Sequence, residues 1–258
     1  MNFSARVVIL RTLTALVLLI VQTTSTGAQS LKVLTAGAFK PVLLAVIPAF
    51  EANTGLKVDL QNDTAGALLK RLQSGEAFDV VVLTMPALDT LSSETVVEPA
   101  SVAAIAKVGI GVAVKAGSLH PPLQTTEQFK AAVLHARKVA YVDPAAGGSS
   151  GIYLSGLFKR LGIDEAVREK AVLVSGGLSA ERVVSGEADL AIQQISELLP
   201  VAGASFVGPL PTEIQNYTTY GIATSPRSQL KKEAALFVNS LSATAVANVI
   251  RSKGMLSP

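Results

Sequence analysis

Short apolar runs and amphipathic segments alternate along the chain from Leu31 onward. The runs LKVLTA, LKVDLQ and FDVVVLT are short and rich in valine and leucine, as expected for strands that are buried on both faces. Segments with helical spacing separate them, and Gly55 and Gly75 follow these segments, as glycine does at helix C-termini. This unit predicts strands at Leu31–Ala36, Leu56–Gln61 and Phe78–Thr84, with helices at Pro41–Asn53 and Ala65–Gly75.

The same alternation restarts after a long apolar stretch with two glycines, Ile105–Val114. The later segments predict strands at Lys138–Asp143, Ala171–Ser175, Ala188–Gln194, Ser205–Pro209 and Asn216–Thr224, and helices at Gly151–Leu161, Leu178–Ser185, Pro226–Ser240 and Thr244–Ser252. A repeated strand–helix–strand order with continuously apolar strands is typical of parallel sheets covered by helices. We therefore predict an α/β protein built from two such units.

The two units share the sequence Ser-Gly-Glu-Ala followed closely by aspartate, at residues 74–79 and 185–189. In both places the pattern predicts a helix that ends and a strand that begins at the aspartate. The repetition has two interpretations. Either a common helix-to-strand loop occurs twice by coincidence, or the two halves are built alike.

Composition excludes several classes of protein. The chain has 258 residues, of which 49% are hydrophobic and 16% charged. Disordered chains have low hydrophobicity and high net charge, so this composition indicates a folded protein. It has no cysteine, which excludes disulfides and thiolate metal sites. The formal net charge is only +3, without the concentrated basic stripe that a nucleic-acid-binding protein needs.

The first 28 residues have the layout of a secretory signal peptide. Arg6 and Arg11 precede the apolar run Thr14–Val21, and a stretch of small residues follows it. Thr26 and Ala28 occupy the −3 and −1 positions of a cleavage site after Ala28. An uncleaved anchor is the alternative, but the run is shorter than the roughly 20 residues that span a bilayer. We expect export to the periplasm with residues 1–28 removed.

Catalytic and metal-binding motifs are scarce. The only histidines, His120 and His135, do not have metal-ligand spacing. Residues 147–151 match G-x-S-x-G, the turn that carries the nucleophile of many hydrolases. In those enzymes the histidine follows the serine, whereas both histidines here precede Ser149. A glycine-rich turn that begins the next helix is therefore the better interpretation, and we predict no catalytic residues, metal or cofactor.

Three turns follow directly on predicted strands, at residues 36–40, 63–66 and 147–151. The first turn of a helix leaves backbone N–H groups unpaired and carries a partial positive charge, which together favour anions. Lys40 adds a full charge at the first turn. Ligands of open α/β sheets bind at the carboxyl ends of the strands. We expect the three turns to line one cleft, although helix capping explains each turn by itself.

These segments resemble the molybdate-binding proteins among the periplasmic solute receptors of ABC transporters. The likeness rests on TAGAFK at 35–40, DTAGALLKRLQSGEAFDVVV at 63–82, GIYLSGLFKRLGI at 151–163, SGEADLAI at 185–192 and GPLPTEIQNYTTYGIA at 208–223. It implies an α/β, two-lobed type II periplasmic binding protein fold. Each lobe would be a mostly parallel sheet flanked by helices, with two crossing strands as the hinge.

The resemblance also implies a division of the chain. We expect lobe 1 to comprise residues 29–112 and 216–258, and lobe 2 to comprise residues 113–215. The hinges should lie near Val112–Lys115 and Pro211–Tyr217.

The resemblance implies a binding site as well, but this sequence departs from the family's pattern. In the family, a serine in each of the first two turns and a tyrosine after the late strand hold the oxyanion. Here Ala38 stands at the first serine, Thr64 stands near the second, and the run Gln193–Glu197 at the end of the late strand contains no tyrosine. The residues that we predict to contact the ligand are Ala38, Phe39, Lys40, Thr64, Ala65, Ser149, Ser150, Tyr153, Gln193 and Gln194. A lysine with glutamines suits a larger anion with carboxylates and hydroxyls, so we predict a small organic anion first and a molybdate-type oxyanion second.

We therefore expect a monomeric periplasmic receptor that captures a small anion and delivers it to the membrane permease of an ABC transporter, with no nucleic-acid partner. Other binding or sensing roles remain open, and so does an enzyme. Relatives on this fold include an aconitate isomerase, and moving a double bond in a tricarboxylate needs only an acid–base group and anion clamps. Glu197, Asp63, Lys40 or Tyr153 could carry the proton, and the sequence favours none of them.

Overall fold

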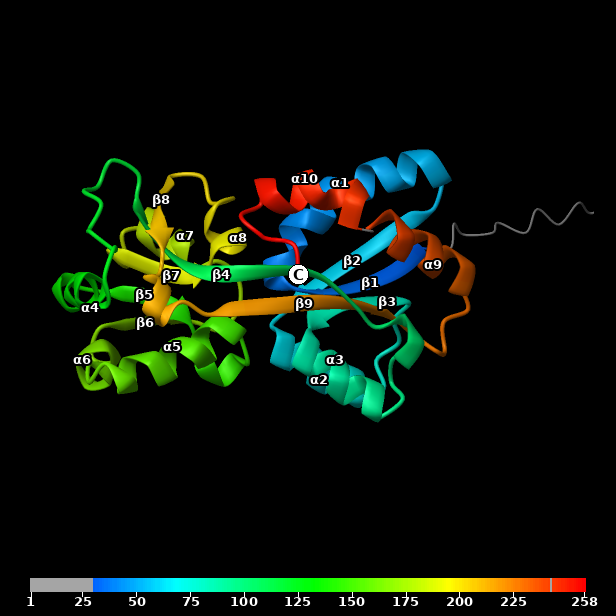
Figure 1. Ribbon diagram of the computed structural model, residues 1–258, viewed down its shortest axis with the longest axis horizontal. Coiled ribbons are helices and arrows are strands. Elements are labelled where there is room, and N and C mark those ends of the chain that lie inside the picture. Colours follow the sequence, from blue (N-terminus) through cyan, green and yellow to red (C-terminus); the bar gives the residue numbers. More distant parts are fainter. Residues whose placement is uncertain (1–29, 242) are drawn as a thin grey trace, which may run out of the picture.

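The computed structural model describes residues 30–241 and 243–258 (Figure 1). The predicted signal peptide lies outside the described residues. The strands are β1 Ser30–Ala36, β2 Lys57–Asp63, β3 Val80–Thr84, β4 Ala103–Lys115, β5 Val139–Val142, β6 Ala171–Val174, β7 Leu190–Gln194, β8 Ala204–Pro209 and β9 Tyr217–Thr224. The α-helices are α1 Lys40–Thr54, α2 Ala65–Gln73, α3 Met85–Ser93, α4 Thr126–His135, α5 Ser149–Arg160, α6 Asp164–Arg168, α7 Ala180–Val184, α8 Ile195–Leu198, α9 Lys231–Ser240 and α10 Ala243–Ser252. Short 3₁₀ helices are η1 Gly37–Phe39, η2 Pro99–Ser101, η3 Pro144–Ala146 and η4 Thr212–Ile214.

The strands form two sheet regions that share β4, in the order β2-β1-β3-β9-β4-β7-β5-β6, with β8 also paired to β4. In the first region β1 is parallel to β2 and β3, and β9 joins β3 in the antiparallel direction. In the second region β5 is parallel to β6 and β7, and β4 joins β7 and β8 antiparallel. Each region contains a small parallel sheet, as the repeated strand–helix pattern predicted, and this sheet is extended by antiparallel pairing.

Strand β4 passes from one sheet region to the other in the middle of its length. Residues Ala103–Gly109 pair with β9, and residues Ile110–Lys115 pair with β7 and β8. We call residues 30–109 and the described residues after Asn216 the first half, and residues 110–216 the second half. The change of partners at Gly109 and Ile110 comes a few residues before the hinge expected near Val112–Lys115.

At this crossing, the side-chain amide of Gln215 makes the two hydrogen bonds that a neighbouring strand would otherwise make with Ile110. Its Oε1 accepts a hydrogen bond from the Ile110 amide at 2.8 Å, and its Nε2 donates to the Ile110 carbonyl oxygen at 2.9 Å. One side-chain amide therefore satisfies both backbone groups of Ile110 at the point where β4 leaves its first partner.

The repeated Ser-Gly-Glu-Ala-(x)-Asp sequence does the same work in both halves. Asp79 accepts a hydrogen bond from the Lys32 amide at 2.8 Å, beside the start of β1. Asp189 accepts from the amides of Arg137 and Lys138, directly before β5. The glutamate of each copy also pairs with an arginine five residues earlier, in the salt bridges Arg71–Glu76 and Arg182–Glu187. The two halves are built alike at this loop.

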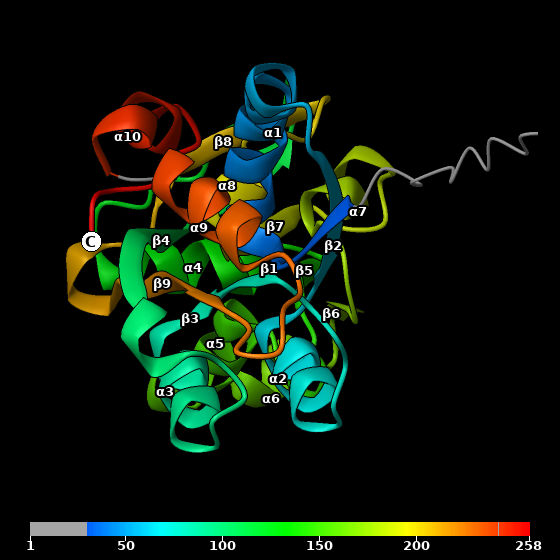
Figure 2. The same cartoon turned by 90° about the vertical axis from the view of Figure 1, so that its right-hand side faces the viewer.

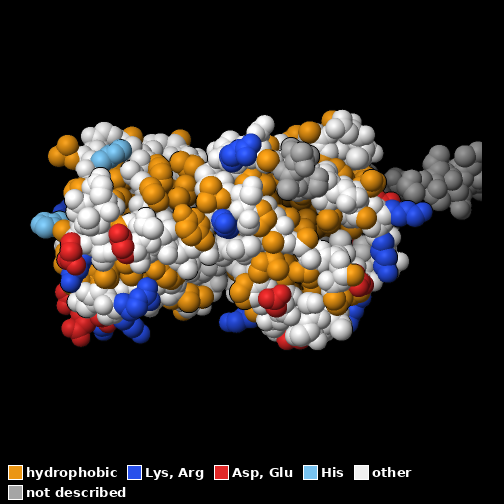
Figure 3. Space-filling view, viewed as in Figure 1, with side chains coloured by type: hydrophobic (Ala, Val, Ile, Leu, Met, Phe, Trp, Pro, Cys, Tyr) orange, Lys and Arg blue, Asp and Glu red, His pale blue; other side chains and the backbone are white. Residues whose placement is uncertain are grey.

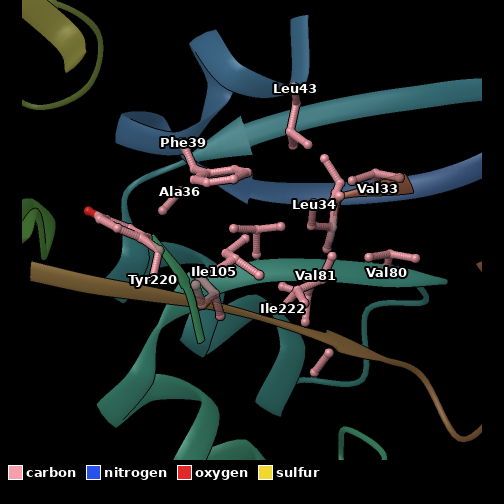
Figure 4. Packing of buried hydrophobic residues seen from close by; sticks show 14 of the residues in the cluster. Val33, Leu34, Ala36, Phe39, Leu43, Val80, Val81, Ile105, Tyr220 and Ile222 are labelled. Carbon is pink, nitrogen blue, oxygen red and sulfur yellow. The ribbon is translucent and has the colours of Figure 1, made fainter. Parts of the chain in front are cut away.

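Helices cover both faces of the sheet in the first half. Seen from the end of the molecule, α1, α9 and α10 lie on one face of the sheet and α2 and α3 on the other (Figure 2). The core between them includes Val33, Leu34, Val81 and Ile222, which are at most 1% exposed (Figure 4). The second half has separate buried clusters, one of which includes Ile110, Phe129 and Leu154. Each half therefore has a hydrophobic core of its own, and neither core depends on the contact between the halves.

The apolarity of the helices and the distribution of surface charge both bear on function. In the part of the chain that the structure describes, no helix is long and apolar enough to cross a membrane. On the face shown in Figure 3, lysine and arginine side chains are scattered, with acidic side chains among them at both ends of the molecule.

Candidate functional site

A cavity of about 330 Å³ lies between the two halves. The first half lines it with Ala36, Gly37, Ala38, Lys40, Pro41, Leu44, Asn62, Asp63, Thr64, Ala65 and Tyr220, and the second half with Val142, Gly148, Ser149, Ser150, Gly176, Gly177, Leu178, Gln193, Gln194, Glu197 and Pro200. Most of the lining residues lie at or just after the carboxyl ends of β1, β2, β5, β6 and β7, the edge at which open α/β sheets bind ligands.

Backbone contacts between the halves close one side of the cavity. The Gly66 amide at the start of α2 donates to the Gly147 carbonyl oxygen at 3.0 Å, and the Thr64 hydroxyl donates to the Ala146 carbonyl oxygen. A Cβ atom added at Gly66 would lie 2.9 Å from the Cα of Gly147, closer than real side chains approach. Glycine at both positions therefore permits this contact.

Two buried side-chain hydrogen bonds also join the halves. The Ser196 hydroxyl in α8 donates to the Ala38 carbonyl oxygen at 2.7 Å. The Gln194 side-chain amide at the end of β7 donates to the Tyr220 hydroxyl of β9 at 2.8 Å. These hydrogen bonds join the halves on several sides of the cavity, so the structure shows a closed arrangement of the two halves.

Helix starts converge on the cavity, as predicted. Lys40 is the first residue of α1, and Thr64 caps α2 by accepting from the Ala67 amide at 3.1 Å. Gly148 precedes α5, which has no side-chain cap. Because Gly148 has no side chain to cap α5, the amides of the first turn of this helix are available to a ligand at the cavity wall.

The G-x-S-x-G sequence is the turn between β5 and α5. Cβ atoms added at Gly148 and Gly151 would lie 2.4 Å from Cγ1 and 2.2 Å from the carbonyl oxygen of Val142, respectively. The glycines therefore let α5 begin directly against the end of β5. His120 and His135 bond to Ser205 and to the Ala131 carbonyl oxygen, and neither lines the cavity. The motif is a helix start, with no histidine at hand for a hydrolase.

Glu197 brings a buried carboxyl group into the cavity wall. The residue is 8% exposed, and its Oε1 lies 2.6 Å from where a Cβ of Gly37 would stand. Among the described residues it forms no salt bridge. Burial raises the pKa of the Glu197 carboxyl to about 8, although a hydrogen bond with Gln193 opposes the rise. At neutral pH this group is a neutral acid with one proton to donate.

Tyr220 is a polar cavity residue that the sequence analysis did not anticipate. Its ring lies at the edge of the apolar core beside Ala36 and Phe39, and its hydroxyl points away from that core (Figure 4). Burial, with the neighbouring Glu197 carboxyl second, raises the pKa of the Tyr220 hydroxyl, so the group stays protonated at neutral pH. A tyrosine therefore lines the cavity after all, but it comes from β9.

The other charged side chains that line the cavity are Asp63 and Lys40, and they differ in their partners. Asp63 accepts a hydrogen bond from the Thr64 amide and forms a salt bridge with Arg71 at 3.3 Å. Lys40 forms no salt bridge within residues 30–241 and 243–258. With Glu197 neutral and Asp63 paired, Lys40 is the lining charge without a counterion in the described chain.

Eight of the ten predicted contact residues line the cavity: Ala38, Lys40, Thr64, Ala65, Ser149, Ser150, Gln193 and Gln194. Phe39 does not, because its side chain is fully buried in the core of the first half. Tyr153 does not either, because its hydroxyl donates to the Ile214 carbonyl oxygen at 2.8 Å. Gln193 lines the wall, but its amide holds the adjacent loop by accepting from the Ser179 amide and donating to the Gly177 carbonyl oxygen.

No group of three or more histidine and acidic side chains that could hold a metal ion occurs within the described part of the chain. The polar groups of the cavity are backbone amides, hydroxyls, side-chain amides, the Lys40 ammonium group, the Glu197 carboxyl and the Asp63 carboxylate, which is paired with Arg71. This donor-rich set matches the needs of an anion.

Comparison with known families fits this architecture. The model of the family described as bacterial extracellular solute-binding protein matches residues 31–256. The chain belongs to this family. A relative within reach of sequence comparison is an aconitate isomerase from Pseudomonas sp., 33% identical over 247 residues that cover 92% of this chain and 93% of the relative.

Solved structures of solute-binding proteins share the fold. The periplasmic molybdate-binding protein of Azotobacter vinelandii aligns with a TM-score of 0.75 and 21% identity, covering 89% of this chain and 100% of its own. The sulfate-binding protein of Mycobacterium tuberculosis aligns with a TM-score of 0.65 and 17% identity, covering 88% and 86%. These matches confirm the predicted two-lobed type II periplasmic binding protein fold and the resemblance to molybdate-binding proteins.

Proposed function

We propose that this solute-binding protein captures a small organic anion between its two halves and delivers it to the permease of an ABC transporter. The observation that carries the proposal is the cavity of about 330 Å³ in which Lys40 and the uncapped start of α5 contribute positive charge from opposite halves. Membership of the solute-binding family supports a receptor. We expect it to act in the periplasm as a monomer, after cleavage behind Ala28.

The lining favours a carboxylate-bearing ligand over a tetrahedral oxyanion. A dehydrated tetrahedral oxyanion needs neutral donors packed tightly around it, whereas this cavity has Ala38 in the first turn and a volume in the range of sites for larger molecules. Lys40, Ser149 and the protonated Glu197 are donors for carboxylate or hydroxyl oxygens spread over several carbon atoms.

A thermal-shift screen of purified protein against di- and tricarboxylates, molybdate and sulfate tests this proposal. A ligand at about 100 times its dissociation constant adds about 2.7 kcal/mol to the free energy of unfolding, so a true ligand raises the melting temperature by several degrees. We expect a carboxylate to give the largest shift. If molybdate alone raised the melting temperature, the proposed organic ligand would be wrong and the ligand would be a tetrahedral oxyanion.

An isomerase acting on a tricarboxylate is the second candidate. The aconitate isomerase from Pseudomonas sp. is 33% identical over nearly its whole length, and this favours the candidate. Moving a double bond requires removal of a proton from one carbon and delivery of a proton to another, and a group with a pKa near neutrality is suited to both steps. Glu197 is buried in the cavity wall and has such a pKa, which makes it our choice of proton carrier over Asp63, Lys40 and Tyr153.

Chromatography of recovered ligand separates the two candidates. A receptor incubated with cis-aconitate or trans-aconitate should return the same isomer. Interconversion that disappears in Glu197→Gln would establish the isomerase and overturn the receptor as the sole function.

A further inference from the structure

Glu197 is an unusual group for an anion-binding wall. Its carboxyl is buried at the cavity between α8 and η1, where its Oε1 lies 2.6 Å from the Cβ position of Gly37. If Glu197 were ionised, it would place a second negative charge beside any bound anion with little solvent between them, which is strongly unfavourable. Charge repulsion at this position therefore favours anion binding only when the Glu197 carboxyl is neutral.

The surroundings of Glu197 supply no cation that would hold it ionised. The titratable side chains that line the same cavity are Lys40 of α1, Asp63 of β2 and Tyr220 of β9. Of the other segments packed against α8, η1, β7 and β8 contain no titratable residue. The lysines Lys107 and Lys115 of β4, and Lys253 beside Gly254, do not line the cavity. Within the described chain, Glu197 has no salt bridge.

We propose that Glu197 makes anion binding proton-linked: the cavity accepts its anion together with the acid form of Glu197, whose O–H donates to a ligand carboxylate. The proposal rests on the anion-binding function proposed above and specifies how that site is regulated. It follows that the ligand must present an acceptor oxygen near α8 and η1. The raised pKa of the Glu197 carboxyl, about 8, places the change in the mildly alkaline range.

The test is calorimetric titration of the protein with four probes, trans-aconitate, cis-aconitate, citrate and molybdate, between about pH 6.5 and pH 9.5. Above about pH 8 the dissociation constant should rise about tenfold per pH unit, because only the protonated fraction of Glu197 binds. Titration at about pH 9 in two buffers of different ionisation enthalpy should show uptake of about 0.9 proton per anion.

Glu197→Gln is the informative variant, since its amide keeps the shape of the side chain and still donates a hydrogen bond. Its affinity should be independent of pH over this range, and its proton uptake should be close to zero. Glu213→Gln, an exposed change in η4, should behave as the unchanged protein. Lys40 is retained in both variants, so any pH dependence that comes from Lys40 appears in both.

The outcomes separate this inference from the proposed function. If none of the four anions binds at about pH 6.5, the anion-binding function fails and the inference with it. If an anion binds and its affinity in the unchanged protein stays level to about pH 9.5, or if Glu197→Gln retains the same pH dependence, the inference alone fails. The calorimetry of the unchanged protein decides the matter even if the variant does not fold.

Discussion

At the scale of single residues, the charge of the cavity wall depends on how far its side chains are buried. Lys40 keeps a partly exposed position at the start of α1, whereas Glu197 is 8% exposed and has no counterion in the described chain. Burial penalises the charged form of the Glu197 carboxyl and raises its pKa to about 8, so this acid is neutral at neutral pH. A wall that carries both residues is therefore positive at neutral pH.

Replacing Glu197 with glutamine should change the pH dependence of stability. The pKa of this carboxyl is about 8 in the folded protein and about 4.5 when exposed, so folding favours the protonated form. Its contribution is fully present below about pH 4.5 and is lost as the pH rises through about 8, at up to about 1.4 kcal/mol per pH unit. Glu197→Gln should remove this loss and be the more stable protein at about pH 8. Urea unfolding across the pH range measures the difference.

The exposed change Glu213→Gln serves as the control for that series and should leave the pH dependence as it was. A parallel pH dependence of the unchanged protein and Glu197→Gln would show that the Glu197 carboxyl is ionised in the fold, contrary to our account.

Ser149 should matter for ligand binding and not for the helix that it begins. Gly148, and not Ser149, occupies the capping position of α5, and the Ser149 hydroxyl approaches Tyr220 at the cavity. Ser149→Ala should weaken anion binding by about 1 kcal/mol, the scale of one hydrogen bond, with the melting temperature of the free protein unchanged. Calorimetry and thermal unfolding measure the two effects. Ser155→Ala, on the same helix but outside the cavity, should alter neither affinity nor ligand choice.

The residues that the sequence could and could not predict differ in what fixes their position. Lys40, Thr64 and Ser149 each stand at the start of the first α-helix after a strand, so the order of elements along the chain places them at the cavity. Phe39 was predicted as a contact, but its apolar ring is more stable in the core. Tyr220 was not predicted, because only the pairing of β9 with β3 and β4 brings it beside Gln194.

At the scale of elements, apolar runs and glycine caps predicted the strands and most helices of both units to within a few residues. Four helices were not predicted: α3, α4 and the short helices α6 and α8. Pro86 stands in the first turn of α3, where proline is favourable, yet a proline directly after a strand also suggests a loop. The segment before α4 contains two prolines, and the capping box of Thr125 and Gln128 that begins the helix was overlooked.

The start of α2 should decide whether the halves can close. Gly66→Ala adds a Cβ that would lie 2.9 Å from Gly147 Cα, so the two backbones must separate. Alanine favours a helix over glycine by about 1 kcal/mol, so the free protein should not lose stability through α2 itself. We expect anion affinity to fall about tenfold or more, in line with an overpacking cost of about 1–3 kcal/mol. Small-angle scattering with saturating ligand should give a larger radius of gyration than the unchanged protein.

Gly156→Ala is the matched control, since its Cβ would meet only the flexible end of Arg160 at 3.5 Å. Equal affinity and equal radius of gyration in both variants would mean that the contact between Gly66 and Gly147 is not needed for closure.

The crossing of β4 should depend on the amide of Gln215. Glutamate in its place can accept from the Ile110 amide but cannot donate to the Ile110 carbonyl oxygen. Gln215→Glu should lower the free energy of unfolding by about 1–3 kcal/mol, the cost of an unsatisfied buried polar group. Chemical unfolding measures it, with the exposed Gln229→Glu as the control. An unchanged free energy in Gln215→Glu would show that water replaces the lost donor at the crossing.

At the scale of the whole molecule, two α/β units that are built alike at their Ser-Gly-Glu-Ala loops enclose one cavity, in a chain of the bacterial extracellular solute-binding protein family. The repeated strand–helix pattern predicted two α/β units with parallel strands, because a parallel sheet needs helices on both faces, and the resemblance to molybdate-binding proteins implied the two-lobed fold. The identity of the ligand could not be predicted in the same way. It depends on side chains from β1, β7, β9 and the helix starts, which only the closed arrangement of the halves brings together.

Equilibrium titration of the purified mature protein with carboxylates and molybdate, in the unchanged chain and in Lys40→Met, tests the central claim most directly. Our account predicts one carboxylate anion bound per chain, with the affinity of Lys40→Met weaker by about 1.5–3 kcal/mol, the scale of a hydrogen bond to a charged group. The control Lys232→Met, an exposed change on α9, should bind as the unchanged protein does. Absence of binding by every anion, or equal affinity in the unchanged chain and Lys40→Met, would contradict it.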